Sequence, residues 1–217
     1  MNIVCLVFEG LTALDAVGPY EVLAKLPSAN FRFVAPQPGL IATDDKLLCL
    51  QVADGIDAVS EADLLLVPGG FGTRPLMRDE RVLAWLRAID RTTQLTASVC
   101  TGALLLAAAG LLRGRRANTH WALREQLAEL GAIPCADRYV RDGKYATAAG
   151  VSAGIDLALA LVIELAGPDV ARSIQLAIEY DPRPPLDGDV ERAPADLREP
   201  LKARMLARDR AFWATQR

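Results

Sequence analysis

The sequence is poor in the residues that build metal and disulfide sites. The 217-residue chain has one histidine and four cysteines, Cys5, Cys49, Cys100 and Cys135, which are widely scattered and never form a Cys-x-x-Cys pair. A structural zinc site needs four Cys or His ligands in paired spacing, so we expect no bound metal. The thiols are expected to stay reduced, as is usual in the cytoplasm, where we predict that the protein resides.

Long apolar runs and an excess of positive charge are also absent. The longest apolar runs, 103–109 and 157–163, are far shorter than the stretch of about 20 residues that spans a bilayer. The N-terminus has neither the basic region nor the cleavage site of a signal peptide. With 24 Lys and Arg against 27 Asp and Glu, the chain lacks the basic footprint of a nucleic-acid binder. We therefore expect neither membrane nor nucleic-acid partners.

Apolar runs alternate with helical patterns along the chain. Strands are predicted at 2–8, 31–35, 47–52, 64–67, 95–99 and 116–120, and helices at 14–26, 79–90, 101–109, 121–130, 152–165, 168–178 and 195–213. A hairpin is predicted between 139–140 and 145–148 across Asp142-Gly143. This order predicts an α/β fold, a three-layer α/β/α sandwich with a mainly parallel central sheet.

One domain is expected to account for most of the chain. We place it at residues 1–180, a length that buries a sufficient core without a disulfide or metal. The remainder, 181–217, starts with the Pro-rich segment 181–185 and continues into a charged amphipathic helix. We expect this helix to pack on the outside of the same domain.

The most informative segment for function surrounds Cys100. The apolar run 95–99 ends at this cysteine, and Thr101 and Gly102 begin a helical pattern. This order is typical of a nucleophile elbow, a tight strand-to-helix turn that projects one side chain above the sheet. The positive end of the helix is expected to lower the thiol pKa from about 8.5 to below about 7.5. A buried structural cysteine at a strand end is the alternative.

Two further loops follow predicted strands. The glycines of Pro68-Gly69-Gly70 lack the Lys-Ser/Thr of a phosphate loop, so they form either an ordinary turn or a backbone N–H site for a developing oxyanion. Asp15 follows the first strand, at the carboxyl edge where open α/β sheets bind ligands. It is either an acid in the same cleft as Cys100 or a carboxylate that caps a helix. Glu21, on the helix that follows, is a further candidate.

His120 is the only imidazole in the chain. Its position beside Trp121 fits a packed, hydrogen-bonded residue as well as a partner base for Cys100. If the ring does not reach the cysteine, no Cys-His dyad is possible, and a carboxylate must carry the proton.

These motifs resemble those of the PfpI-like superfamily. The resemblance rests on Leu-Asp15-x-x-Gly-Pro-Tyr-Glu-Val-Leu, on Val-Pro-Gly-Gly-x-Gly, on Ser-Val-Cys100-Thr-Gly-Ala and on Ala-Asn-Thr-His120-Trp, and it covers nearly all of residues 1–195. It implies the flavodoxin-like sandwich of class I glutamine amidotransferases. The later segments beginning at Thr147 and Gln175 most resemble the isonitrile hydratase branch.

The resemblance implies a role for each matching residue. Cys100 corresponds to the nucleophile, Asp15 to the acid that hydrogen-bonds it and handles protons, and the N–H groups around Gly70 and Thr101 to the oxyanion site. Thr101 stands where the protease branch has histidine, which argues against proteolysis. The implied reaction is hydration of an isonitrile to an N-substituted formamide without metal or organic cofactor, and the implied assembly is a homodimer.

Two alternatives remain open. One is a redox-sensing or carbonyl-detoxifying relative that uses the same cysteine on oxidants or glyoxals. The other is a non-catalytic ligand-binding domain related to AraC-type regulators, which add a DNA-binding segment. Only about 35 residues follow Asp181, too few for two helix-turn-helix units. Every reading predicts a small-molecule ligand.

Overall fold

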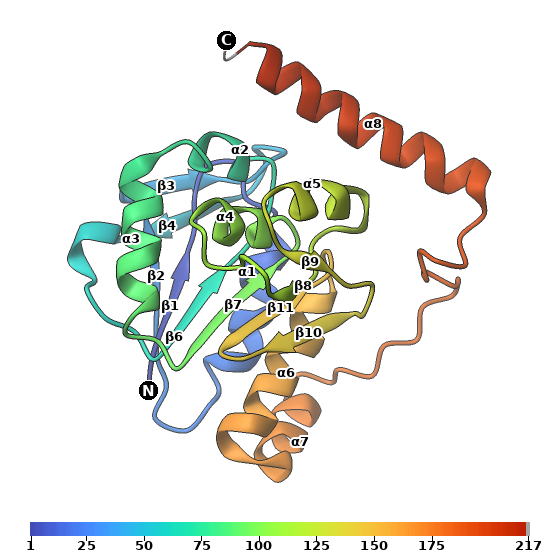
Figure 1. The fold of residues 1–217 in the computed structure, drawn as a ribbon. Helices are drawn as coiled ribbons and strands as arrows, with labels where there is room; N and C mark the ends of the chain where they lie inside the picture. Colours follow the sequence, from blue (N-terminus) through green and yellow to red (C-terminus); the bar gives the residue numbers. More distant parts are fainter. Residues whose placement is uncertain (216–217) are drawn as a thin grey trace.

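A seven-stranded sheet forms the middle layer of the computed structural model, which describes residues 1–215 (Figure 1). The strand order is β10-β11-β7-β6-β1-β2-β5, and all neighbours are parallel except the β10–β11 hairpin. The strands are β1 (Asn2–Leu6), β2 (Asn30–Ala35), β5 (Asp54–Gly55), β6 (Leu64–Val67), β7 (Leu95–Val99), β10 (Tyr139–Asp142) and β11 (Tyr145–Ala148).

Helices cover both faces of this sheet and complete the predicted three-layer α/β/α sandwich (Figure 1). One face carries α1 (Ala13–Leu23), α6 (Ala153–Ala166) and α7 (Pro168–Ala177). The other carries α3 (Glu80–Asp90), α4 (Gly102–Ala108), the 3-10 turn η2 (Trp121–Leu123) and α5 (Arg124–Glu129). The predicted fold class is confirmed.

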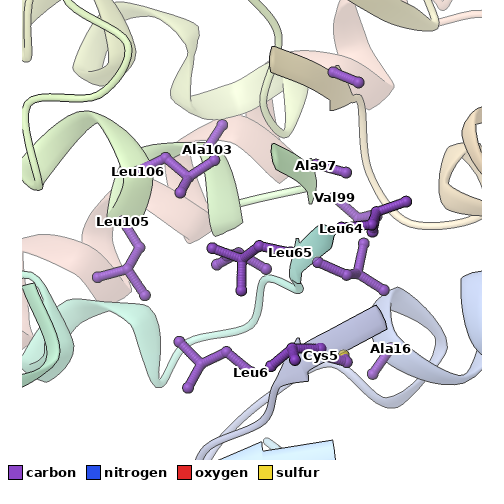
Figure 2. Close-up of a cluster of buried hydrophobic side chains, with 14 of the residues drawn as sticks. Cys5, Leu6, Ala16, Leu64, Leu65, Ala97, Val99, Ala103, Leu105 and Leu106 are labelled. Atoms are coloured by element: carbon purple, nitrogen blue, oxygen red, sulfur yellow. The ribbon is translucent and has the colours of Figure 1, made fainter. Parts of the chain in front are cut away.

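The central strands are apolar because both of their faces are covered. All residues of β6 and β7 are buried, as expected for parallel strands between two helical layers. Figure 2 shows Cys5 of β1 beside Ala16 of α1, whereas Leu65 of β6 lies on the side of Leu105 and Leu106 of α4. The core therefore continues through the sheet from one helical layer to the other.

Gly102 lets α4 begin directly against the sheet. A Cβ atom at this position would lie 2.0 Å from the Val67 carbonyl oxygen, so no larger residue fits without moving the backbone. The close approach ties the start of α4 to the end of β6. Cys100 is thereby held next to the loop that follows β6.

Several local predictions need correction. The predicted strand 116–120 is only β8 (Arg116–Ala117), which pairs with β9 (Ile133–Pro134) outside the main sheet. The ladder stops because the Asn118 N–H donates to Thr147 Oγ1 at 2.8 Å and the Thr119 N–H to Asn118 Oδ1 at 2.8 Å. Such local bonds to side chains compete with sheet formation. The predicted helix 121–130 is divided into η2 and α5.

Five short elements were not predicted. They are β3 (Gly39–Ala42), β5 (Asp54–Gly55), the 3-10 turn η1 (Ile56–Ala58), α2 (Thr73–Leu76) and β9 (Ile133–Pro134). β3 pairs with β4 (Cys49–Val52) as a two-stranded sheet. The predicted strand 47–52 is thus confirmed in its second part and lies outside the central sheet.

The C-terminal helix α8 (Ala195–Ala214) lies across the molecule near α2 and α5 (Figure 1). Its Lys202 pairs with Glu125 of α5 at 2.8 Å, and its Asp209 pairs with Arg74 of α2 at 2.5 Å. The domain limits at 180 and 181 stay a prediction, and residues 216 and 217 of the predicted segment lie outside the described part. Within residues 1–215, no helix is both long and apolar enough to cross a membrane.

Candidate active site

Three loops meet at the carboxyl edge of the sheet. They follow β1, β6 and β7, which are adjacent in the order β7-β6-β1. The loop after β1 leads to Asp15 in α1, the loop after β6 contains Gly69 and Gly70, and Cys100 directly follows the last residue of β7. Because parallel strands present these ends at one edge, ligands of open α/β sheets bind there. The topology thus brings together the residues that the sequence indicated.

Cys100 occupies a strained turn between β7 and α4. Its φ is +55°, a left-handed conformation that residues other than glycine seldom adopt. The turn is held by the Cys100 N–H, which donates to the carbonyls of Ala148 and Ala149 at 3.2 and 3.1 Å, and by the Thr119 hydroxyl, which donates to the Cys100 carbonyl at 2.9 Å. Such strain is maintained only where the surroundings enforce it, and it clusters at active sites.

Asp15 is fully buried beside this cysteine. Its Oδ2 accepts a hydrogen bond from the Gly69 N–H at 2.9 Å. Its Oδ1 is buried with no hydrogen-bond partner among the described residues, and the carboxyl group interacts with the Cys100 thiol. Burial raises the pKa of Asp15 to about 7, although the Gly69 and Cys100 contacts oppose the shift. A buried carboxyl group of this kind is suited to transfer protons near neutral pH.

The predicted lowering of the Cys100 pKa is wrong. Burial, followed by the negative charge of Asp15, raises this pKa well above its usual value. The Thr101 backbone N–H and the Arg74 charge lower it, but they do not compensate for the loss of water around the sulfur. Cys100 and Asp15 therefore titrate as a coupled pair, and the pair retains one proton above the Asp15 pKa of about 7.

Thr101 and Gly70 form a closed hydrogen-bonded bracket. The Gly70 N–H donates to Thr101 Oγ1 at 2.9 Å, and that hydroxyl donates back to the Gly70 carbonyl at 3.1 Å. The Gly70 N–H is therefore already engaged by the Thr101 hydroxyl, and the oxyanion role of the N–H groups around Gly70 and Thr101 stays a prediction. With a φ of +124° and a would-be Cβ position 2.4 Å from the Thr12 nitrogen, position 70 requires glycine.

His120 lies in the same cavity but makes no hydrogen bond to Cys100 within residues 1–215. Its Nδ1 accepts the Ala122 N–H at 3.3 Å. Burial, aided by the charges of Arg74 and Arg124, lowers the pKa of His120 to about 4, so the ring is neutral at neutral pH. Glu21 points elsewhere and pairs with Lys25 at 2.9 Å on the outside of α1.

A cavity of about 160 Å³ opens onto Cys100. Its lining includes Thr101, His120, Gly70 and several residues that the sequence did not indicate, namely Asp44, Phe71, Arg74, Val151, Met205 and Arg208. Arg74 stands just before Pro75 in the short helix α2 that follows the glycines, a position that carries no recognisable signal. Met205 and Arg208 come from α8, which we expected only on the outside. A larger open groove along α6 and the segment 180–191 does not include Cys100 or Asp15.

The described residues offer no cluster of three or more His, Cys, Asp or Glu side chains arranged for a metal ion. The polar groups that line the cavity include instead the Cys100 thiol, the Asp44 carboxyl group, a neutral imidazole and two guanidinium groups. The Asp15 carboxyl group lies buried next to the thiol. This set can hold a small substrate, donate and accept a proton, and supply a sulfur nucleophile.

Together the fold and the site define an α/β protein with a buried cysteine–aspartate pair at the carboxyl edge of a parallel sheet. The chain belongs to the DJ-1/PfpI family, whose sequence profile matches residues 1–164. The resemblance noted from the motifs is thereby confirmed.

Individual relatives extend this result. The isonitrile hydratase of Pseudomonas putida is 43% identical over 92% of this chain and 87% of its own. The HTH-type transcriptional regulator CdhR of Pseudomonas aeruginosa is 38% identical over 76% of this chain, which spans 49% of that regulator. A THiJ/PfpI family protein from Pseudomonas syringae superposes with a TM-score of 0.91 and 36% identity, over 95% of this chain and 86% of the other.

Proposed function

We propose that this protein is an enzyme that hydrates an isonitrile to an N-substituted formamide. The observation that carries the proposal is the buried Cys100–Asp15 pair: the Asp15 carboxyl group interacts with the thiol, and its Oδ1 has no hydrogen-bond partner among the described residues. The 43% identity to an isonitrile hydratase over most of both chains supports the same reaction.

The first step uses the proton that the pair shares. This proton passes through Asp15 to the terminal isonitrile carbon while the Cys100 sulfur bonds to the same carbon. The product is a thioimidate on Cys100, and Asp15 is left as the carboxylate. A carboxyl group whose pKa lies near 7 makes this transfer at neutral pH.

The second step returns both residues to their starting state. Asp15 takes a proton from water as the water oxygen bonds to the thioimidate carbon, and it passes that proton to the substrate nitrogen. It then takes the proton of the new hydroxyl group while the carbon–sulfur bond breaks and its electron pair returns to sulfur. The formamide leaves, and the pair again holds one proton. Neither step uses a metal or organic cofactor.

The alternatives have less support. Oxidation of a cysteine follows its thiolate character and exposure, whereas Cys100 is only 5% exposed and its pKa is raised. The match to CdhR covers only 49% of that regulator. A purely ligand-binding role for this chain is therefore an alternative outcome of the test below. The homodimer and the cytoplasmic location also stay predictions.

Formamide production from a small panel of isonitriles tests the proposal. We expect turnover by the unaltered protein, none by Cys100→Ala, and full turnover by the matched control Cys135→Ala, which removes a thiol outside the cavity. Saturable binding without formamide would indicate the sensor role instead. Turnover of a glyoxal but of no isonitrile would indicate the carbonyl-detoxifying role.

A further inference from the structure

A buried ion pair joins α8 to the edge of the cavity. Arg74 Nε donates to Asp209 Oδ1 at 2.5 Å, and the two side chains are only 5% and 9% exposed. Asp209 Oδ2 also accepts from Gln126 Nε2 at 3.4 Å. Buried ion pairs contribute little net stability once the loss of hydration is counted. A contribution to stability therefore does not explain why this ion pair lies beside the cavity.

The second contact of Arg74 is with the loop that supports Cys100. Its Nη1 donates to the Gly70 carbonyl at 3.2 Å and to Thr73 Oγ1 at 3.0 Å. The Gly70 carbonyl and N–H also form the bracket with Thr101, the residue that follows Cys100. A continuous set of hydrogen bonds therefore runs from Asp209 through Arg74 and Gly70 to the turn that carries the thiol.

Arg74 also presents its charge to the cavity. It lines the same space as Cys100, and its charge lowers the pKa of both Cys100 and His120. The other titratable or charged groups that line this space are Asp44, His120 and Arg208, and Asp15 lies buried behind it in contact with Cys100. Arg208 is exposed, with its Cζ 3.9 Å from the Phe71 ring centroid. Arg74 is almost completely buried, so its charge is screened less by solvent than that of Arg208.

We propose that Arg74 is a positioning residue for the cysteine, which holds the Gly70–Thr101 bracket and presents a positive charge to the thiol, and that Asp209 of α8 fixes its guanidinium there. The C-terminal helix is then part of the active-site structure rather than an external addition. This inference rests on the proposed role of Cys100 as nucleophile, but its test does not require isonitrile turnover.

The test is the pH dependence of Cys100 alkylation by iodoacetamide, followed by peptide mapping. The double variant Arg74→Gln/Asp209→Asn removes both charges and leaves no buried charge unpaired. We expect the midpoint of the curve of Cys100 alkylation rate against pH to rise by about one pH unit in this variant. This corresponds to about a tenfold loss of thiolate at a fixed pH below the midpoint. The conservative variant Arg74→Lys keeps the charge and should restore a midpoint close to that of the unaltered protein.

The matched control is Lys202→Gln/Glu125→Gln. It neutralises the other ion pair that anchors α8, whose Glu125 side chain is 78% exposed, and should leave the midpoint unchanged. If the first double variant does not fold, Arg74→Met/Asp209→Leu replaces the pair with apolar side chains, a change that buried pairs often tolerate, and the same rise is expected. An unchanged or lowered midpoint in the folded charge-free variant would overturn the proposal.

Discussion

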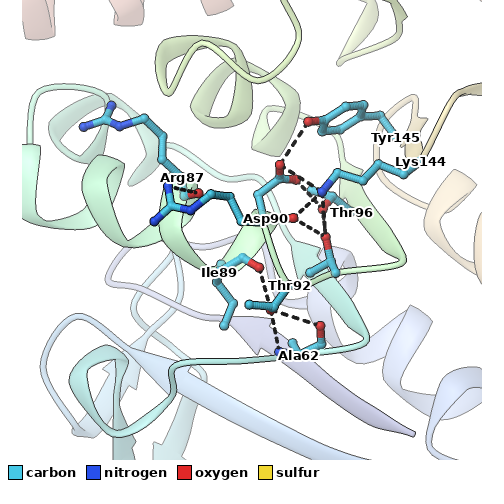
Figure 3. A network of polar contacts seen from close by, with 10 residues as sticks. Ala62, Arg87, Ile89, Asp90, Thr92, Thr96, Lys144 and Tyr145 are labelled. Carbon is cyan, nitrogen blue, oxygen red and sulfur yellow. Dashed lines mark hydrogen bonds and ion pairs between the residues drawn. The ribbon is translucent and has the colours of Figure 1, made fainter.

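Two buried aspartates, one at the amino ends and one at the carboxyl ends of the parallel strands, have different roles in this molecule. Asp90, at the end of α3, accepts from Thr96 Oγ1 at 2.7 Å and from the Tyr145 hydroxyl at 3.0 Å, and pairs with Lys144 at 3.0 Å (Figure 3). Asp15 has one hydrogen bond, from Gly69, and its other oxygen has no partner within the described chain.

The contrast identifies which carboxyl group is available for chemistry. A buried polar group that is fully hydrogen-bonded contributes to the fold, whereas one that lacks a partner carries an energetic cost that function must justify. Asp90 joins α3, β7 and the start of β11 far from the cavity. Asp15 faces a thiol in a strained turn. Changes at the two positions should therefore separate activity from stability.

The largest effect is expected on activity, from Asp15→Asn. The amide keeps the size and one acceptor oxygen for the Gly69 N–H but cannot transfer a proton. We expect the rate of formamide formation to fall by about 10²–10⁴-fold while the protein remains folded. Rates measured beside circular dichroism spectra decide this, and full activity in the variant would contradict the role given to Asp15.

The matched change Asp90→Asn should have the opposite effect, with a loss of stability and no loss of activity. The amide leaves the Lys144 ammonium without its carboxylate and gives Tyr145 a poorer acceptor. We expect the free energy of unfolding to fall by about 1–3 kcal/mol, with the rate per folded molecule unchanged. Urea unfolding and activity of the same preparation test this pair of expectations. A loss of activity as deep as that of Asp15→Asn would remove the contrast.

The pH dependence of stability sharpens the comparison at Asp15. Its pKa of about 7 in the folded protein is above the ordinary value of 3.8, so between these values the folded state binds more protons than the unfolded state. The Asp15 contribution to stability therefore decreases as pH rises from about 4 to about 7. Asp15→Asn should gain stability relative to the unaltered protein over that range. A difference between their unfolding free energies that does not change with pH would count against the raised pKa.

A smaller effect is expected from His120→Ala. The ring is neutral and its Nδ1 already accepts the Ala122 N–H, so it shapes the cavity without carrying the proton. The loss of formamide production should stay below about tenfold, well short of the loss for Asp15→Asn. If the two losses are equal, the imidazole takes part in proton transfer and the assignment to Asp15 alone fails.

The sequence predicts the parts of the molecule that depend on short-range patterns. The runs at 64–67 and 95–99 coincide with β6 and β7 because a strand covered on both faces must be apolar throughout. The position of Cys100 at the end of β7 follows directly from the second run. Asp15 and Gly70 come into reach of Cys100 because adjacent parallel strands place their carboxyl ends side by side.

What the sequence does not predict depends on long-range contacts and on desolvation. Arg74 and Asp209 are 135 residues apart, and nothing local indicates that α8 reaches the cavity. The thiol pKa follows from burial, which outweighs the N–H groups of one helix end. The use of the Gly70 N–H by the Thr101 hydroxyl depends on the placement of two loops, and neither loop alone reveals it.

The central claim is that the Cys100 sulfur bonds to the substrate carbon. Peptide mapping by mass spectrometry of protein quenched during isonitrile turnover tests it most directly. We predict that the peptide containing Cys100 gains the mass of one isonitrile, as addition of the thiol across the terminal carbon requires, and that the peptides containing Cys5, Cys49 and Cys135 do not. An adduct on one of those cysteines, or undiminished formamide production by Cys100→Ala, would contradict the account.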